Sequence, residues 1–145
     1  MLTLEDKYIV NSNLSELFNI LNCYIEVHDS ISKISIWRLF SRIDYKSYAD
    51  KLVSILSELD VVMQTIASSP PFNNSPAIEY SAALAETIRK LHTICDRLHD
   101  KTQNRSYSMS EYNQDFAAYN RLVQNYSHSG RHLSDWRLQG DRVNL

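Results

Sequence analysis

A single apolar stripe between residues 75 and 101 constrains the fold of this chain more than any other feature of its sequence. The stripe has alternating spacings of four and three residues: Leu84, Ile88, Leu91, Cys95 and Leu98. Such spacing puts all five side chains on one face of an α-helix. Ser75 is suited to cap that helix and Pro76 to begin it, because the first helical position needs no N–H donor. We therefore predict one long helix around which the other segments pack.

Residues 45–68 predict a second helix, at the centre of the molecule. Asp44 precedes the segment as an N-cap, and the apolar face is wide enough for a helix with neighbours on several sides. Its apolar positions are Leu52, Ile55, Leu56, Leu59, Val62, Met63 and Ile66. Only a short loop separates this segment from 75–101, so we expect the two helices to be antiparallel neighbours.

The N-terminal segment 1–28 also predicts helix, although its continuity is open. Thr3 is a plausible cap, with acidic residues in the first turn. The stripe that follows consists of Leu14, Leu17, Phe18, Leu21, Tyr24 and Ile25. Asn13 and Glu16 offer a second capping-box spacing. The sequence therefore allows one helix or two, and we favour a break near residues 11–13.

Residues 108–130 predict a helix with an aromatic seam. Ser108 and Glu111 have the spacing of a capping box, and Gly130 is suited to end the helix. The seam is made of Met109, Tyr112, Phe116, Tyr119, Val123 and Tyr126. Residues 131–145 would then form a C-terminal extension, either flexible or docked through its few apolar side chains.

Composition agrees with an all-α fold. Two glycines and three prolines in 145 residues are few for antiparallel sheets joined by tight turns. Residues 30–43 alternate partly like a strand, but no second strand is available to pair with them, so we expect a short extra helix there. We therefore predict an antiparallel four-helix bundle in one domain, residues 1–130, with the short helix 30–43 and the extension 131–145.

Composition and missing motifs also exclude several function classes. The net charge of −2 gives no general attraction to nucleic acids or membranes, and no run approaches the ~20 apolar residues of a membrane span. Cys23 and Cys95 lie in apolar runs and predict buried thiols in a reducing compartment, so we expect a cytoplasmic protein. Neither a glycine-rich phosphate loop nor a hydrolase motif occurs, so we expect no cofactor and no conventional active site. The Asn, Ile and Tyr content suits an AT-rich gene, such as one on a mobile element.

His92, Cys95 and His99 form the one group with metal-ligand chemistry on a single helical face. Imidazole and thiolate are ordinary zinc ligands, but Cys95 belongs to the core stripe and the histidines lie at its edge. The grouped candidates for a fourth ligand are Cys23, Glu26 and His28. We keep the three residues as a weak candidate and predict no metal.

Arg121 and His128 enclose six residues in the sequence RLVQNYSH. The spacing resembles the Arg-x4–6-His motif of the HEPN ribonucleases, which are small helical domains. This resemblance implies, as an alternative function, a metal-independent ribonuclease in which the pair acts on the scissile phosphate across a dimer interface. Leu122 departs from the motif, because a polar residue usually follows the arginine.

Residues 29–51 carry a net positive charge, with Trp37 and Tyr45 among the charged side chains. The basic residues are Lys33, Arg38, Arg42, Lys46 and Lys51. Basic residues interleaved with aromatic ones can contact phosphates and stack on bases. The commoner arrangement is a solvated helix face with Trp37 in the core, so nucleic acid is an alternative partner only.

The aromatic seam of residues 108–130 is the strongest functional signal. Tyrosine suits a position that is apolar on one side and wet at its tip, and aromatic residues are favoured at interface centres, although core packing is the commoner role. We predict a protein-protein interaction module of adaptor, inhibitor, immunity or anti-defence type rather than an enzyme. Its predicted binding residues are Tyr112, Tyr119, Tyr126, Arg131, Trp136 and Arg137. A heptad seam closes equally well within one chain or against a second copy, so a homodimer is also compatible.

Overall fold

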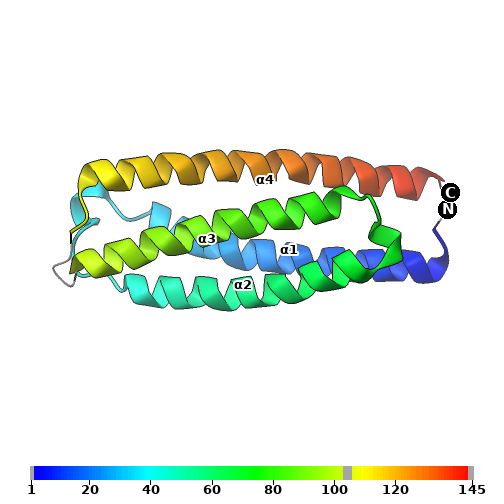
Figure 1. Cartoon of the computed structure of the whole chain (residues 1–145), viewed down its shortest axis with the longest axis horizontal. Coiled ribbons are helices and arrows are strands. Elements are labelled where there is room, and N and C mark those ends of the chain that lie inside the picture. The colour runs from blue at the N-terminus through cyan, green and yellow to red at the C-terminus, as the bar shows by residue number, and fades with distance from the viewer. Residues whose placement is uncertain (1, 103–105, 144–145) are drawn as a thin grey trace.

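The computed structural model describes residues 2–102 and 106–143, with side chains for residues 2–101 and 106–138. These residues contain four long helices and no strand: α1 (Leu4–Ser32), α2 (Tyr45–Ser68), α3 (Pro76–Thr102) and α4 (Met109–Val143). Two 3-10 turns, η1 (Ile36–Arg38) and η2 (Pro70–Phe72), lie in the connections. Successive helices run antiparallel, and α1 begins at the end of the bundle where α4 ends (Figure 1). The predicted all-α four-helix bundle is confirmed.

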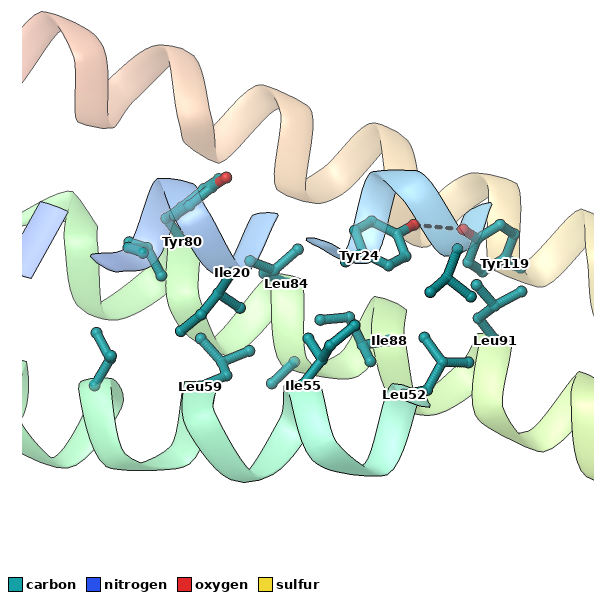
Figure 2. Packing of buried hydrophobic residues seen from close by; sticks show 14 of the residues in the cluster. Ile20, Tyr24, Leu52, Ile55, Leu59, Tyr80, Leu84, Ile88, Leu91 and Tyr119 are labelled. Carbon is teal, nitrogen blue, oxygen red and sulfur yellow. Dashed lines mark hydrogen bonds between the residues drawn. The ribbon is translucent and has the colours of Figure 1, made fainter. Parts of the chain in front are cut away.

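The core forms where the predicted stripes of α2 and α3 meet. All five stripe residues of α3 are buried, and α2 buries Leu52, Ile55, Leu59, Val62 and Ile66. Side chains from the two helices point toward one another across the core (Figure 2). Each fully buried aliphatic side chain stabilises the fold by about 1.5–3 kcal/mol. The helix α3 packs extensively against both α2 and α4, which confirms its central position.

The helix α1 is continuous, so the break predicted near residues 11–13 is wrong. Its start is as expected, because Thr3 Oγ1 accepts a hydrogen bond from Asp6 N–H at 3.0 Å and Asp6 accepts one from Thr3 N–H at 3.1 Å. Asn13 does not start a second helix. Its side-chain amide donates to the backbone oxygen of Ile9, one turn earlier, at 2.8 Å. The buried stripe runs through this turn from Val10 to Ile31, and its packing maintains the helix.

The connection between α1 and α2 differs from the short helix predicted for residues 30–43. The helix α1 extends to Ser32, and only the three residues of η1 are helical after it. The Tyr45 hydroxyl donates to the backbone oxygen of Leu39 at 2.5 Å, and both residues are buried, so the connection is held against the bundle. Trp37 is 92% exposed and Ile36 58% exposed. The expectation that Trp37 lies in the core is therefore wrong.

The helix α4 continues through Gly130, so the C-terminal cap predicted there is wrong. A Cβ atom at this position would lie 3.2 Å from a ring carbon of Tyr80, and the glycine therefore permits close packing of α4 on α3. Beyond it, Leu133 is buried and Trp136 stacks on Phe72 with ring centroids 5.9 Å apart. The predicted extension thus continues the bundle as far as Val143, and residues 144–145 lie outside the described chain.

Two of the three predicted N-caps at the later helices are formed. Asp44 accepts from Ser47 N–H at 3.0 Å, and Ser108 accepts from Glu111 N–H at 3.1 Å. Ser75 differs, because its hydroxyl is buried and no described residue hydrogen-bonds to it. A buried hydroxyl without a partner destabilises the fold instead of capping α3.

We expect Ser75→Ala to leave the free energy of unfolding unchanged or to raise it by about 1 kcal/mol, because it removes an unpaired buried hydroxyl. Urea denaturation measures this directly. Ser108→Ala is the matched control, and the loss of its working cap should cost about 1 kcal/mol. A loss of similar size in Ser75→Ala would show that Ser75 does cap α3.

Candidate functional site

The aromatic seam of α4 faces α1 and α3, where it joins aromatic residues of both helices. Consecutive rings have centroids 5.5–6.5 Å apart along the series Tyr107, Tyr112, Phe116, Tyr119, His28, Tyr24, Tyr126 and Tyr80. We call these eight residues the aromatic layer. Spacings of this size are favourable for aromatic pairs. The backbones of α1 and α4 stay farther apart than those of α3 and α4, and the large rings fill the space between them.

A hydrogen-bond network lies inside this layer. The hydroxyls of Tyr24 and Tyr119 hydrogen-bond to one another across the gap between α1 and α4 (Figure 2). His28 Nδ1 lies 2.6 Å from the same Tyr119 hydroxyl, and Ser32 Oγ lies 3.3 Å from His28 Nε2. Both tyrosines are fully buried, so their hydroxyls need these partners. The one fully buried hydroxyl of the seam, that of Tyr119, is therefore used within the bundle.

Burial also sets the protonation state of the layer. It raises the pKa of Tyr24 and Tyr119 above the ordinary tyrosine value, and for Tyr24 the neighbouring Tyr119 raises the pKa further. Burial likewise raises the pKa of Tyr80, Tyr112 and Tyr126. These hydroxyls stay protonated at neutral pH, which suits hydrogen bonding in a core and not proton abstraction.

A second polar cluster surrounds Asp115, which joins α4 to α3. Its carboxylate accepts from Lys90 Nζ at 3.0 Å, from Arg97 Nη1 at 2.6 Å and from the Tyr107 hydroxyl at 2.7 Å. Burial by itself would raise the pKa of Asp115. The hydrogen bonds from Tyr107, Arg97 and Lys90 outweigh that effect and hold its pKa below the ordinary value. Together, these three hydrogen bonds hold the start of α4 against α3.

The predicted binding residues on α4 divide by exposure. Tyr119 is fully buried, so a partner on the outer surface of the bundle cannot touch its side chain. Tyr112 and Tyr126 are half-buried within the aromatic layer, and Trp136 is half-buried against Phe72. The exposed members of the set are Arg131 and Arg137. A contact of this face with a partner remains a prediction, and it rests mainly on the two arginines.

The weak metal candidates are held by other interactions. His92 Nδ1 lies 3.7 Å from Asp96 Oδ2, and Cys95 is fully buried. Burial raises the pKa of the Cys95 thiol to about 12, with a smaller effect from Asp96, so the thiol stays protonated. No group of three or more potential metal-ligating His, Cys, Asp or Glu residues occurs in the part of the chain that the structure describes. Cys23 is exposed, which corrects the expectation that both thiols are buried.

Arg121 and His128 both lie on the outer surface of α4. Their separation of two helical turns places them on one face of the helix. His128 Nε2 is 3.2 Å from His132 Nε2, and the two rings meet edge to face. The ribonuclease alternative therefore has an exposed pair of side chains and stays a prediction.

The five predicted nucleic-acid contacts, Lys33, Arg38, Arg42, Lys46 and Lys51, are all exposed. Tyr45 is fully buried and cannot stack on a base, whereas Trp37 is free to do so. Asp44 and Asp50 share an open hollow with Lys46 and Lys51, so the basic surface is interrupted by acids. The available signal for the exposure of Trp37 was its place in a short segment with a weak helical pattern, between Lys33 and Arg38.

Comparison with protein-family models, curated proteins and solved structures finds no match to this chain. None of the described helices is long and apolar enough to cross a membrane.

Replacing Tyr119 with Phe tests the network in the aromatic layer. The variant removes the hydroxyl that pairs with both Tyr24 and His28, so the buried Tyr24 hydroxyl and the half-buried His28 ring each lose a partner. We expect the free energy of unfolding in urea to fall by about 1–3 kcal/mol. Tyr8→Phe, at an exposed position of α1, is the control and should change it little. Equal effects in the two variants would contradict the role of the network.

The Asp115 cluster predicts a dependence of stability on pH. Because the folded-state pKa lies below the ordinary value of 3.8, the carboxylate stabilises the fold fully above that pH. The contribution is lost as the pH falls through the folded-state pKa. We expect Asp115→Asn to be about 1–3 kcal/mol less stable than the native chain near neutral pH. This difference in the free energy of unfolding should become smaller below about pH 4. If the difference in the free energy of unfolding stayed constant until both proteins unfolded in acid, the stabilising role of the Asp115 carboxylate would be refuted.

Proposed function

We propose that this protein is a small cytoplasmic protein-binding module, of the adaptor or inhibitor kind, and that η1 carries its main anchor. The observation that carries the proposal is the exposure of Trp37, with Ile36 exposed beside it. The exposed basic residues Lys33, Arg38 and Arg42 lie close to the two apolar residues in the sequence. We call these five residues the η1 tip.

Apolar side chains that stay in water are a source of binding free energy when a partner covers them. Removing apolar area from water stabilises by about 25 cal/mol per Å², and a buried Trp contributes 150–250 Å². A partner that covers Trp37 would thus gain on the order of a few kcal/mol from this residue alone. Tryptophan and arginine are also the residues that most often dominate binding at protein interfaces.

The position of the η1 tip also suits binding. The connection that carries it lies at one end of the bundle, away from the start of α1 (Figure 1). Buried Leu39 and the hydrogen bond from Tyr45 hold the connection against the core, so the tip is presented by a rigid scaffold. Binding residues are commonly found on loops supported in this way. The exposed arginines of α4, Arg131 and Arg137, supply a second contact area in the same proposal.

Capture of partners from the native host tests the main anchor. We expect the immobilised native chain to retain a partner and Trp37→Ala to weaken its binding about thirtyfold or more, as at an interface hot spot. Leu4→Ala is the matched control, because Leu4 is also an exposed apolar residue but lies at the other end of the bundle. Unchanged affinity in Trp37→Ala would contradict the proposal for η1. If affinity were unchanged in Trp37→Ala but lost in an Arg131→Ala/Arg137→Ala variant, binding would be assigned to α4 alone.

A further inference from the structure

The charges of this chain are unevenly distributed between α1 and the η1 tip. The helix α1 holds one lysine, Lys7, against five acids: Glu5, Asp6, Glu16, Glu26 and Asp29. Residues 33–43, by contrast, hold three basic side chains and no acid. The helix α1 is therefore an acidic flank of the bundle, and the connection that follows it is basic and carries exposed apolar side chains.

An open hollow of about 370 Å³ lies on the acidic flank, between α1 and α2. It is lined by Glu16, Asn19, Ile20, Glu58, Val61 and Val62. Ile20 and Val62 are buried side chains at its floor, while Val61 is 64% exposed. The described lining thus combines an apolar surface with two carboxylates and contains no basic residue. We call it the α1–α2 hollow.

We propose that the η1 tip of one copy of this chain docks in the α1–α2 hollow of a second copy. This inference rests on the proposed function, since it takes the η1 tip as a binding surface and names its partner. Ile36 and Trp37 cover the exposed apolar surface around Val61, while the basic residues of the tip face Glu16 and Glu58. The two halves of the contact carry opposite charges, and both contribute apolar area.

The same charges disfavour the competing arrangements. A contact between two η1 tips would place basic side chains against each other. A contact between two hollows would place carboxylates against each other, and both contacts would be repulsive. The hollow lies near residue 18 of α1, and the helix ends at residue 32. At about 1.5 Å per residue, the two places are roughly 20 Å apart along the helix. An antiparallel second copy that is offset along this face makes the contact twice, which closes a two-fold dimer.

Charge reversal and its repair test the proposal on the full-length chain. We expect sedimentation velocity over a concentration series to show a monomer–dimer equilibrium for the native protein. Arg38→Glu and Glu58→Lys should each raise the dimer dissociation constant about tenfold or more, and the double variant should recover most of the affinity, because the pair is then restored with opposite sign. Arg121→Glu, an exposed reversal on the outer face of α4, is the control and should dimerise like the native chain.

A native chain that stays monomeric at every concentration would overturn the proposal, and so would a double variant no better than its parents. The native chain could be monomeric while Trp37→Ala still abolishes the capture of a host protein. That combination would exclude the second copy as the occupant, and the η1 tip would remain a binding surface for another protein. Trp37→Ala in the same sedimentation series should weaken the dimer as strongly as either reversal. A Trp37→Ala dimer of native affinity would show that the η1 tip is not in the contact.

Discussion

The hydrogen bond between Tyr24 and Tyr119 is the interaction on which the closure of the bundle depends. The helices α2 and α3 pack through aliphatic stripes, but α1 and α4 stand farther apart and meet through large rings. Tyrosines fill that space only if their hydroxyls find partners inside it, and each of these two supplies one for the other. The end of α1, the middle of α4 and the ring of His28 are all positioned by this contact.

This use of tyrosine redirects the search for function. A seam of tyrosines along a helix suggests a surface that meets a partner, yet here the rings lie between helices and the Tyr119 hydroxyl is hydrogen-bonded there to Tyr24 and His28. The outer face of α4 is left to polar side chains such as Arg121 and Arg131. Among the large apolar side chains that the structure describes, Trp37 is the most exposed. It lies in a connection that packs against the bundle but leaves this side chain in solvent. Binding is therefore proposed at the end of the molecule and on the flank between α1 and α2.

The sequence was sufficient for the fold because the stripes of α2 and α3 are regular and their helices are long. Leu84, Ile88 and Leu91 could be assigned to the core from spacing alone, and α2 begins and ends where its cap and prolines predict. The helix break predicted near Asn13 and the helix end predicted at Gly130 are wrong for the same reason. Both residues favour helix ends locally, but the packing of the flanking turns maintains the helix through them. At Gly130 the small size of glycine allows the close approach of Tyr80, which no local pattern reveals.

The candidate site was less predictable, since exposure in a short connection depends on tertiary contacts. The weak helical pattern and the basic neighbours of Trp37 favour exposure but do not decide it, and the partner of the Tyr119 hydroxyl lies 95 residues away. For the same reason Ser75 has the identity of a cap but is buried without forming one. Long-range geometry decides each of these cases.

An alkaline titration of the tyrosines, followed by phenolate absorbance together with helical circular dichroism, tests most directly whether they form the core. Burial raises the pKa of seven of the nine tyrosines: Tyr24, Tyr45, Tyr80, Tyr107, Tyr112, Tyr119 and Tyr126. Most of the phenolate signal should therefore appear above the ordinary pKa of about 10 and should coincide with the loss of helix. Ionisation of all the tyrosines in a single step near that value, with the helical signal intact, would show that the aromatic layer is exposed and contradict this account.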